Sequence, residues 1–231
     1  MLLAFESVTR TASACLVEGD NELAYADLGG GEAERGLVSL LDGLLRRHGR
    51  PQALAVASGP GSFTGLRIAI TAARTLAWIE QLPVHGVDAL AALAAEQGEG
   101  LWWTLLPLKK DTTFHGLFRV SGGIVTTLAE TVAAPDALMP TLHPDTASAI
   151  AIGPALAAKP DLARTWCPGV ALGTSAGPTA RGVARLAPQV PALDWQAILP
   201  AYHQQPAPVL QRQAQSPNAT SSVIPPSGAQ Q

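Results

Sequence analysis

The chain has 231 residues, of which 47% are hydrophobic and only 14% are charged, and its formal net charge is −3. This length can bury a substantial core in one large or two small domains. The acidic balance excludes an overall basic field for nucleic acid, so a role with RNA would need a partner that holds the RNA.

The first part of the chain predicts three strands and a helix. Residues 2–5, 13–17 and 22–28 are short apolar or alternating runs, separated by turn residues. After a glycine cluster at residues 29–31, leucines recur on one side of a predicted helix over residues 32–48. The apolar stripe of this helix consists of Leu37, Leu40, Leu41, Leu44 and Leu45.

A glycine-rich loop follows the next predicted strand, residues 54–57, and opens a second helix over residues 65–80. That helix is apolar almost all round, and Arg67, Thr71 and Arg74 form its thin polar stripe. A helix of this kind is buried in its own fold or against another chain, and the sequence leaves both open. The loop consists of Gly59, Pro60, Gly61, Ser62, Phe63, Thr64 and Gly65.

The loop looks like a phosphate-binding turn, but it departs from each phosphate-binding pattern. A P-loop has Lys and then Ser or Thr after its last glycine, whereas Leu66 and Arg67 follow here. The dinucleotide fingerprint is one residue shorter, and Ser62 lacks the neighbours of a nucleophile elbow. We interpret the loop as a tight turn that closes a strand onto a helix, with nucleotide binding as the alternative.

Past Gly100 the pattern restarts with a second strand-first block. We expect strands at residues 101–108, 114–120, 124–131 and 147–152, and helices at 135–139 and 179–186. This order predicts two related α/β lobes, residues 1–100 and 101–205. Residues 206–231 contain few large apolar side chains, so we expect a disordered tail there.

No group of catalytic or metal-ligating residues stands out. The five histidines are scattered without ligand spacing, and only folding could bring His85 to Ser62 as base and nucleophile. We therefore expect no metal site, no cofactor and no catalytic residue, with a Ser or Cys hydrolase as the enzyme alternative.

The sequence also predicts the compartment. Cys15 and Cys167 lie far apart, so we expect two small apolar residues rather than a disulfide. The N-terminus lacks the basic start of a signal peptide, and no apolar run approaches the roughly 18 residues that span a bilayer. We expect a cytoplasmic protein that does not contact a membrane.

The sequence of the glycine-rich loop is also characteristic of a protein family. Residues 58–68 resemble the signature of the TsaB (YeaZ) family of tRNA threonylcarbamoyladenosine biosynthesis proteins. An apolar start with a turn at Glu6, Ser7 and Thr9, a strand and helix at residues 83–93, and Pro200-Ala201-Tyr202 resemble further family features in the same order. The resemblance covers about residues 1–205 and implies an α/β fold of the actin-like ATPase (ASKHA, ribonuclease H-like) superfamily. In that fold the turn at Glu6 faces a nucleotide, so Glu6, Ser7 and Thr9 are candidates for a degenerate nucleotide turn.

The resemblance implies a non-catalytic subunit in the formation of N6-threonylcarbamoyladenosine at position 37 of tRNA. Such a subunit pairs with the catalytic subunit TsaD, the ATPase TsaE docks on the pair, and tRNA is contacted only indirectly. The chain departs from the family pattern at Glu6 and at residues 107–109. The alternatives are a glycopeptidase-like hydrolase or nucleotide-dependent acyltransferase of the same fold, or a diverged homodimer without TsaD. The partner interface predicted on the two apolar helices consists of Leu37, Leu40, Leu41, Leu44, Leu66, Ile70, Ala73 and Ala77.

Overall fold

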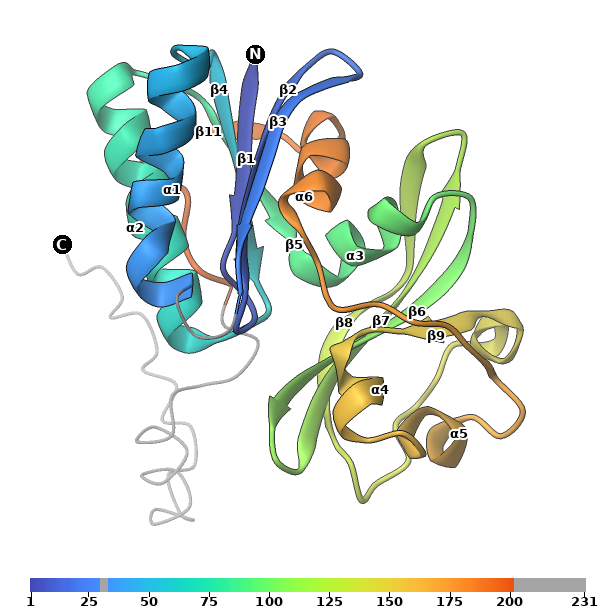
Figure 1. The fold of residues 1–231 in the computed structure, drawn as a ribbon. Coiled ribbons are helices and arrows are strands. Elements are labelled where there is room, and N and C mark those ends of the chain that lie inside the picture. The colour runs from blue at the N-terminus through green and yellow to red at the C-terminus, as the bar shows by residue number, and fades with distance from the viewer. Residues whose placement is uncertain (30–32, 202–231) are drawn as a thin grey trace, which may run out of the picture.

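The computed structural model describes residues 1–29 and 33–201, which form two β-sheets with helices around them (Figure 1). The first sheet has the strand order β11-β5-β4-β1-β2-β3. Strands β1, β4 and β5 are parallel to one another, whereas β2, β3 and β11 join the sheet in antiparallel pairs. Its strands are β1 (Leu2–Glu6), β2 (Ala12–Glu18), β3 (Asn21–Leu28), β4 (Ala53–Gly59), β5 (Val84–Asp88) and β11 (Ala192–Leu193).

Two pairs of helices cover the two faces of this sheet (Figure 1). Helices α1 (Ala33–His48) and α2 (Phe63–Glu80) lie on one face, and α3 (Ala89–Gln97) and α6 (Ala180–Leu186) lie on the other. Strand β1 shows why both faces are apolar. Leu3 and Phe5 pack in the core under α1 and α2, and Ala4 packs in the core under α3 and α6, because successive side chains point to opposite faces.

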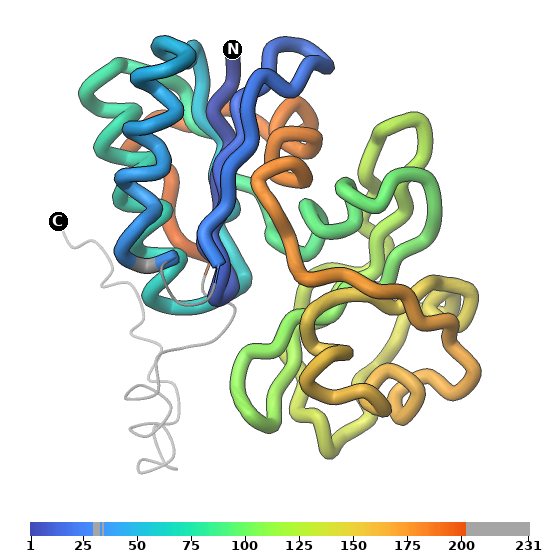
Figure 2. The backbone as a smooth tube through the Cα atoms, viewed as in Figure 1, coloured from blue at the N-terminus to red at the C-terminus, as the bar shows by residue number. Residues whose placement is uncertain are grey.

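The second sheet has the order β10-β9-β6-β7-β8, and α3 separates it from the first sheet (Figures 1 and 2). Helices α4 (Pro154–Ala158) and α5 (Leu162–Trp166) lie over its other face, where Trp103, Leu117 and Trp166 form a separate apolar core. Its strands are β6 (Gly100–Lys109), β7 (Thr112–Ser121), β8 (Ile124–Pro135), β9 (Ile150–Ile152) and β10 (Ala171–Leu172).

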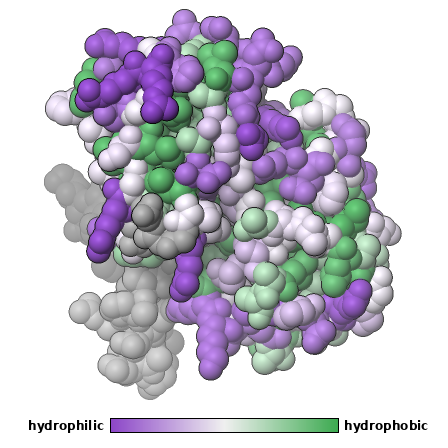
Figure 3. Space-filling model, viewed as in Figure 1, coloured by the Kyte–Doolittle hydropathy of each residue, from purple (hydrophilic) through white to green (hydrophobic). Residues whose placement is uncertain are grey.

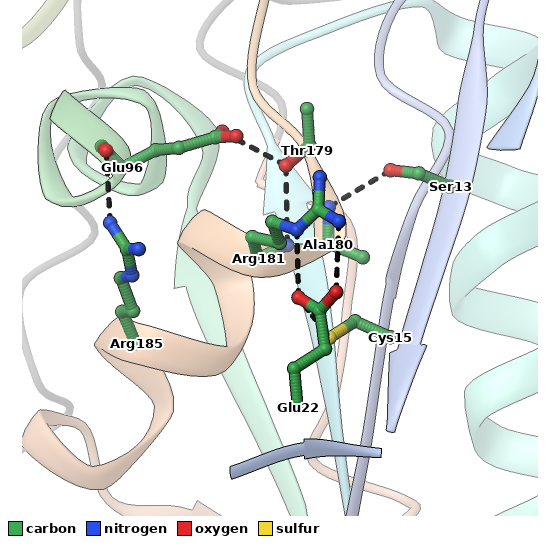
Figure 4. Close-up of polar contacts among 8 residues, drawn as sticks. All are labelled: Ser13, Cys15, Glu22, Glu96, Thr179, Ala180, Arg181 and Arg185. Carbon is green, nitrogen blue, oxygen red and sulfur yellow. Dashed lines mark hydrogen bonds and ion pairs between the residues drawn. The ribbon is translucent and has the colours of Figure 1, made fainter. Parts of the chain in front are cut away.

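Helix α6 returns from the second sheet to the first and is held there by side chains from three elements (Figure 4). The Ala180 N–H donates to Ser13 Oγ on β2, and Arg181 makes two hydrogen bonds with Glu22 on β3. Gly182 lies so close to α3 that a Cβ there would be 2.1 Å from the Ala92 carbonyl oxygen. These contacts fix α3 and α6 as the layer between the two sheets.

Hydrogen bonds also join α3 to α6. Thr179 Oγ1 donates to Glu96 Oε2 at 2.9 Å, and Arg185 Nη1 donates to the Ala95 and Glu96 carbonyl oxygens at the end of α3 (Figure 4). A cation at the C-terminus of a helix is also favoured by the helix dipole.

Three expectations differ from the structure. The helix expected at residues 135–139 is wrong: β8 continues to Pro135, and a turn follows in which Asp136 pairs with Lys159 and accepts a hydrogen bond from Thr113. The strand expected at 147–152 begins only at Ile150, after a 3₁₀ turn (Pro144–Ser148). Strand β11 pairs with β5 in the first sheet, although the expected division counted its residues with the second lobe.

The tail expected over residues 206–231 lies outside the described residues, and no helix within the described ranges is long and apolar enough to cross a membrane.

Candidate functional site

The signature loop, residues 59–65, connects β4 to α2 and is bound to the turn that follows β1. Ser62 is the N-cap of α2, because its Oγ accepts a hydrogen bond from the Gly65 N–H at 3.3 Å. The Ser62 N–H donates to the Val8 carbonyl oxygen at 2.8 Å. The loop therefore holds the start of α2 against the end of β1.

The glycines of the signature loop are required by close backbone packing. A Cβ on Gly61 would lie 2.5 Å from Val8 Cβ, and a Cβ on Gly65 would lie 1.8 Å from the Ser7 carbonyl oxygen. Gly59 has φ +137°, and a Cβ there would lie 2.7 Å from the Ala201 carbonyl oxygen. The motif thus has a structural reason that needs no phosphate.

A cavity of about 1020 Å³ lies between the two lobes, next to the signature loop. Its walls are the turn after β1 (residues 8–11), the loop (61–64) and the end of β6 (106–109). Arg10 and Lys109 are the only charged side chains among the described residues that line it, and both are basic. Cavities of this size accept small ligands, so this cleft is the candidate ligand site of the fold.

The three residues of the expected nucleotide turn do not act together. Thr9 lines the cavity, and its hydroxyl lies 2.7 Å from that of Thr11. Glu6 and Ser7 do not line it. Glu6 is 1% exposed and accepts hydrogen bonds from Ser13 Oγ and the Val8 N–H, and burial raises its pKa to about 7.

The geometry does not pair Ser62 and His85 as the nucleophile and base of the hydrolase alternative. Ser62 Oγ accepts from Gly65, and His85 Nδ1 lies 3.0 Å from the Val190 carbonyl oxygen, so each side chain contacts a different segment. Among the residues that the structure describes, no three His, Cys, Asp or Glu side chains lie close enough together to hold a metal ion.

A second cavity, of about 570 Å³, lies between β2, α3 and α6. Its two basic residues already have partners: Arg181 binds Glu22 and stacks over Tyr25 with 3.6 Å to the ring centroid, and Arg185 binds the end of α3. The groups that line this cavity hold the fold together.

The outer face of α1 and α2 is the second candidate site. Seven of the eight predicted interface residues are at most 5% exposed, and Leu40 is half-buried, because their side chains pack into this chain's own core. The large apolar side chains that these helices expose are others: Val38 (62%), Phe63 (56%), Trp78 (58%) and Ile79 (61%). A partner on this face would meet these four, which the leucine periodicity could not single out.

Comparison with known sequences finds one matching protein family and two curated relatives. A protein family described as "TsaD: tRNA N6-adenosine threonylcarbamoyltransferase" matches residues 47–101. The tRNA threonylcarbamoyladenosine biosynthesis protein TsaB of Bacillus subtilis (strain 168) is 36% identical over 74 residues, 31% of this chain and 32% of that protein. The protein of the same name from Escherichia coli (strain K12) is 32% identical over 105 residues, 44% of each chain. The matched part thus spans a third to less than half of these curated relatives.

Two solved structures from Pseudomonas aeruginosa are similar over most of the chain. One is described as an uncharacterized protein with similarity to the peptidase YEAZ. It is 25% identical with a TM-score of 0.76, over 88% of this chain and 99% of that one. The other, YeaZ, is 26% identical with a TM-score of 0.72, over 87% of this chain and 98% of that one. Together with the family match, they confirm the expected α/β fold of the actin-like ATPase superfamily.

Proposed function

Because the chain belongs to the TsaB (YeaZ) family, we propose that it is an accessory subunit in forming threonylcarbamoyladenosine at position 37 of tRNA. In this proposal it pairs with the catalytic subunit TsaD in the cytoplasm, and the ATPase TsaE docks on the pair. The observation that carries the proposal is the similarity to YeaZ, which extends over 87% of this chain and 98% of that one.

The interlobe cleft supports a non-catalytic role. In a nucleotide-dependent enzyme of this fold, the acidic residue at the end of β1 would face the ligand. Here Glu6 is buried under the turn, and its carboxylate is engaged by Ser13 and Val8. The signature loop also supports a non-catalytic role, because Gly61 and Gly65 leave room for the backbone of residues 7 and 8.

The outer face of α1 and α2 supports pairing. Four large apolar side chains are exposed on these two helices, which lie side by side (Figure 1). Figure 3 shows hydrophobic residues, in green, among hydrophilic ones on this side of the molecule. Exposed apolar groups that gather on one face are typical of a surface that a partner covers. We propose that TsaD packs on these side chains, while the buried leucines beneath them hold the helices in place.

Co-purification of this chain with TsaD of the same cell, followed by size-exclusion chromatography with light scattering, tests the proposal. We expect a 1:1 complex that carries out threonylcarbamoyl transfer to tRNA when TsaE is present, and no transfer by this chain alone. A chain that forms no complex under any condition, or that hydrolyses a peptide substrate alone, would contradict the proposal.

A further inference from the structure

Residues 173–179 connect the second sheet to α6 and pass between the two lobes (Figures 1 and 2). This connection contacts both lobes at Gly177, where a Cβ would lie 3.4 Å from Thr9 Cγ2 and 3.8 Å from Pro154 Cγ. Ala176 lines the interlobe cleft together with Thr9 and Pro154. A change in the spacing of the lobes would therefore displace this connection.

Two hydrogen bonds join the end of the connection to a buried carboxyl group. The Ala180 N–H, at the start of α6, donates to Ser13 Oγ at 2.9 Å (Figure 4), and that hydroxyl donates to Glu6 Oε1 at 2.7 Å. Glu6 Oε2 accepts from the Val8 N–H at 3.0 Å, and Val8 lines the cleft. All four residues are at most 2% exposed. Glu6 is thus linked both to the wall of the cleft and to the start of α6.

Burial and repulsion both disfavour a negative charge on Glu6. Burial raises its pKa to about 7, and the Glu96 carboxylate on α3 adds to the rise. Asp88, at the end of β5, accepts hydrogen bonds from two N–H groups of α3. Among the residues that the structure describes, no basic side chain forms an ion pair with Glu6. Its neutral and ionised forms therefore exchange near neutral pH.

The other titratable groups on the surrounding elements do not offset this charge. On α6, Arg181 is bound to β3 and Arg185 to the end of α3. On β2 and β3, burial raises the pKa of Cys15 to about 12 and also raises that of Tyr25, so both are neutral near pH 7. Arg10, in the turn after β1, is exposed and lines the cleft. Contact with solvent in the cleft would therefore stabilise the ionised form.

We infer that Glu6 is a proton-operated switch of the interlobe cleft: its neutral form keeps the lobes together, and its ionised form opens them. When the carboxyl group loses its proton to solvent, the buried charge gains free energy from hydration. The route for water is the turn after β1, because Val8 contacts both Glu6 and the cleft. Displacing this turn separates Thr9 from Gly177 and weakens the hydrogen bond between β2 and the start of α6. Access to the candidate ligand site would then depend on pH near neutrality.

Distances across the cleft test the switch in this chain alone, so the result does not depend on TsaD. The substitutions Thr64→Cys in the signature loop and Lys110→Cys between β6 and β7 carry spin labels, because both positions are exposed and both native cysteines are buried. Pulsed electron paramagnetic resonance then gives the distance distribution between the two lobes. Dilution with unlabelled chain removes distances between molecules.

The expected result is a longer-distance population that grows with pH. Opening that restores the pKa of Glu6 from about 7 to its ordinary value of 4.5 shifts the ratio of open to closed chains by at most about 30-fold between about pH 5.5 and about pH 8.5. The same distance distribution at both pH values would overturn the inference.

Glu6→Gln supplies the neutral form at every pH. We expect this variant to keep the shorter distances at both pH values, and an opening as large as that of the wild type would overturn the inference. The matched control is Glu130→Gln, which removes a carboxylate from an exposed position on β8 and should open like the wild type. Loss of opening in both variants would also overturn the inference. Circular dichroism verifies that each variant is folded.

A second measurement needs no variant, and it keeps the test decisive if Glu6→Gln does not fold. The carboxyl ¹³C chemical shift of Glu6, in chain labelled at glutamate, follows the ionisation of this residue. Because the two equilibria are linked, the midpoint of this titration should coincide with the midpoint of opening near pH 7. Midpoints that differ by more than about one pH unit would overturn the inference.

Discussion

Gly65 packs against Ser7 so closely that a Cβ on Gly65 would lie 1.8 Å from the Ser7 carbonyl oxygen. One residue is in the first turn of α2, and the other follows β1 directly. The contact explains why the strand–loop–helix signature depends on glycine: the backbone of the turn after β1 occupies the space of a side chain.

Gly65→Ala should therefore destabilise the chain, although Ala is the better helix former. Overpacking typically costs about 1–3 kcal/mol, and here the clash is with rigid backbone, so we expect the upper part of that range. Urea unfolding followed by circular dichroism measures the change. The matched control is Gly43→Ala in α1, where the added Cβ would meet nothing within 4 Å apart from its chain neighbours and the backbone of its own helix, and a gain of about 0.5–1 kcal/mol is expected. Equal effects at the two positions would contradict the packing explanation.

Glu6 should make the chain less stable as the pH rises through neutrality. Burial raises its pKa from 4.5 to about 7, so the folded state binds the proton more tightly than the unfolded state. The resulting stabilisation is complete below about pH 4.5 and is lost as the pH rises through 7, and a shift of this size corresponds to about 3 kcal/mol. Urea midpoints of the wild type and of Glu6→Gln, measured side by side from pH 5 to about pH 8.5, isolate this contribution: the stability of the wild type relative to the variant should fall as the pH rises. A difference between the two proteins that stays level or grows in favour of the wild type would show that Glu6 does not titrate in this way.

His115 should produce the opposite dependence in acid. Its ring packs against the rings of Trp103 and Trp166, and burial lowers its pKa from 6.5 to about 4. The neutral form is favoured in the fold, so its stabilisation is present above about pH 6.5 and is lost as the pH falls through 4, again by about 3 kcal/mol. The two dependences oppose each other between about pH 4.5 and pH 6.5, where both groups titrate. His115→Leu should therefore uncover the fall in stability with rising pH that is due to Glu6. A pH dependence of the urea midpoint that is the same in this variant and in the wild type would exclude the contribution of His115.

Two substitutions by glutamate on α2 should separate folding from pairing. Ile70 is 2% exposed in the core beneath α2, so Ile70→Glu should bury a charge and unfold the chain. Trp78 is 58% exposed, so Trp78→Glu should stay folded and weaken the complex with TsaD by about 2 kcal/mol or more, as for an interface hot spot. Thermal melting and titration calorimetry measure the two effects. Leu138→Glu is the control, because this residue is 63% exposed outside α1 and α2 and should change neither. A folded Ile70→Glu chain, or unaltered binding by Trp78→Glu, would contradict the assignment.

Much of the fold follows from local patterns. The leucine stripe of α1, the strands 2–5 and 13–17 and the start of α2 at the signature loop are where the periodicity predicts them, because these signals depend on neighbours in the sequence. The short elements α4, α5, β10 and β11 were not predicted. With two to five residues each, they carry no period, and they form because the second sheet and strand β5 offer them partners.

The sequence by itself determined the fold class and the family mark, since both reside in short-range order: apolar period, strand–glycine–helix spacing and turn residues. Only the tertiary structure decided which apolar side chains are available to a partner. Leu37 and Val38 are adjacent in the same helix, and one is fully buried while the other is 62% exposed. Burial depends on what packs against a residue from distant parts of the chain, and no local pattern records that.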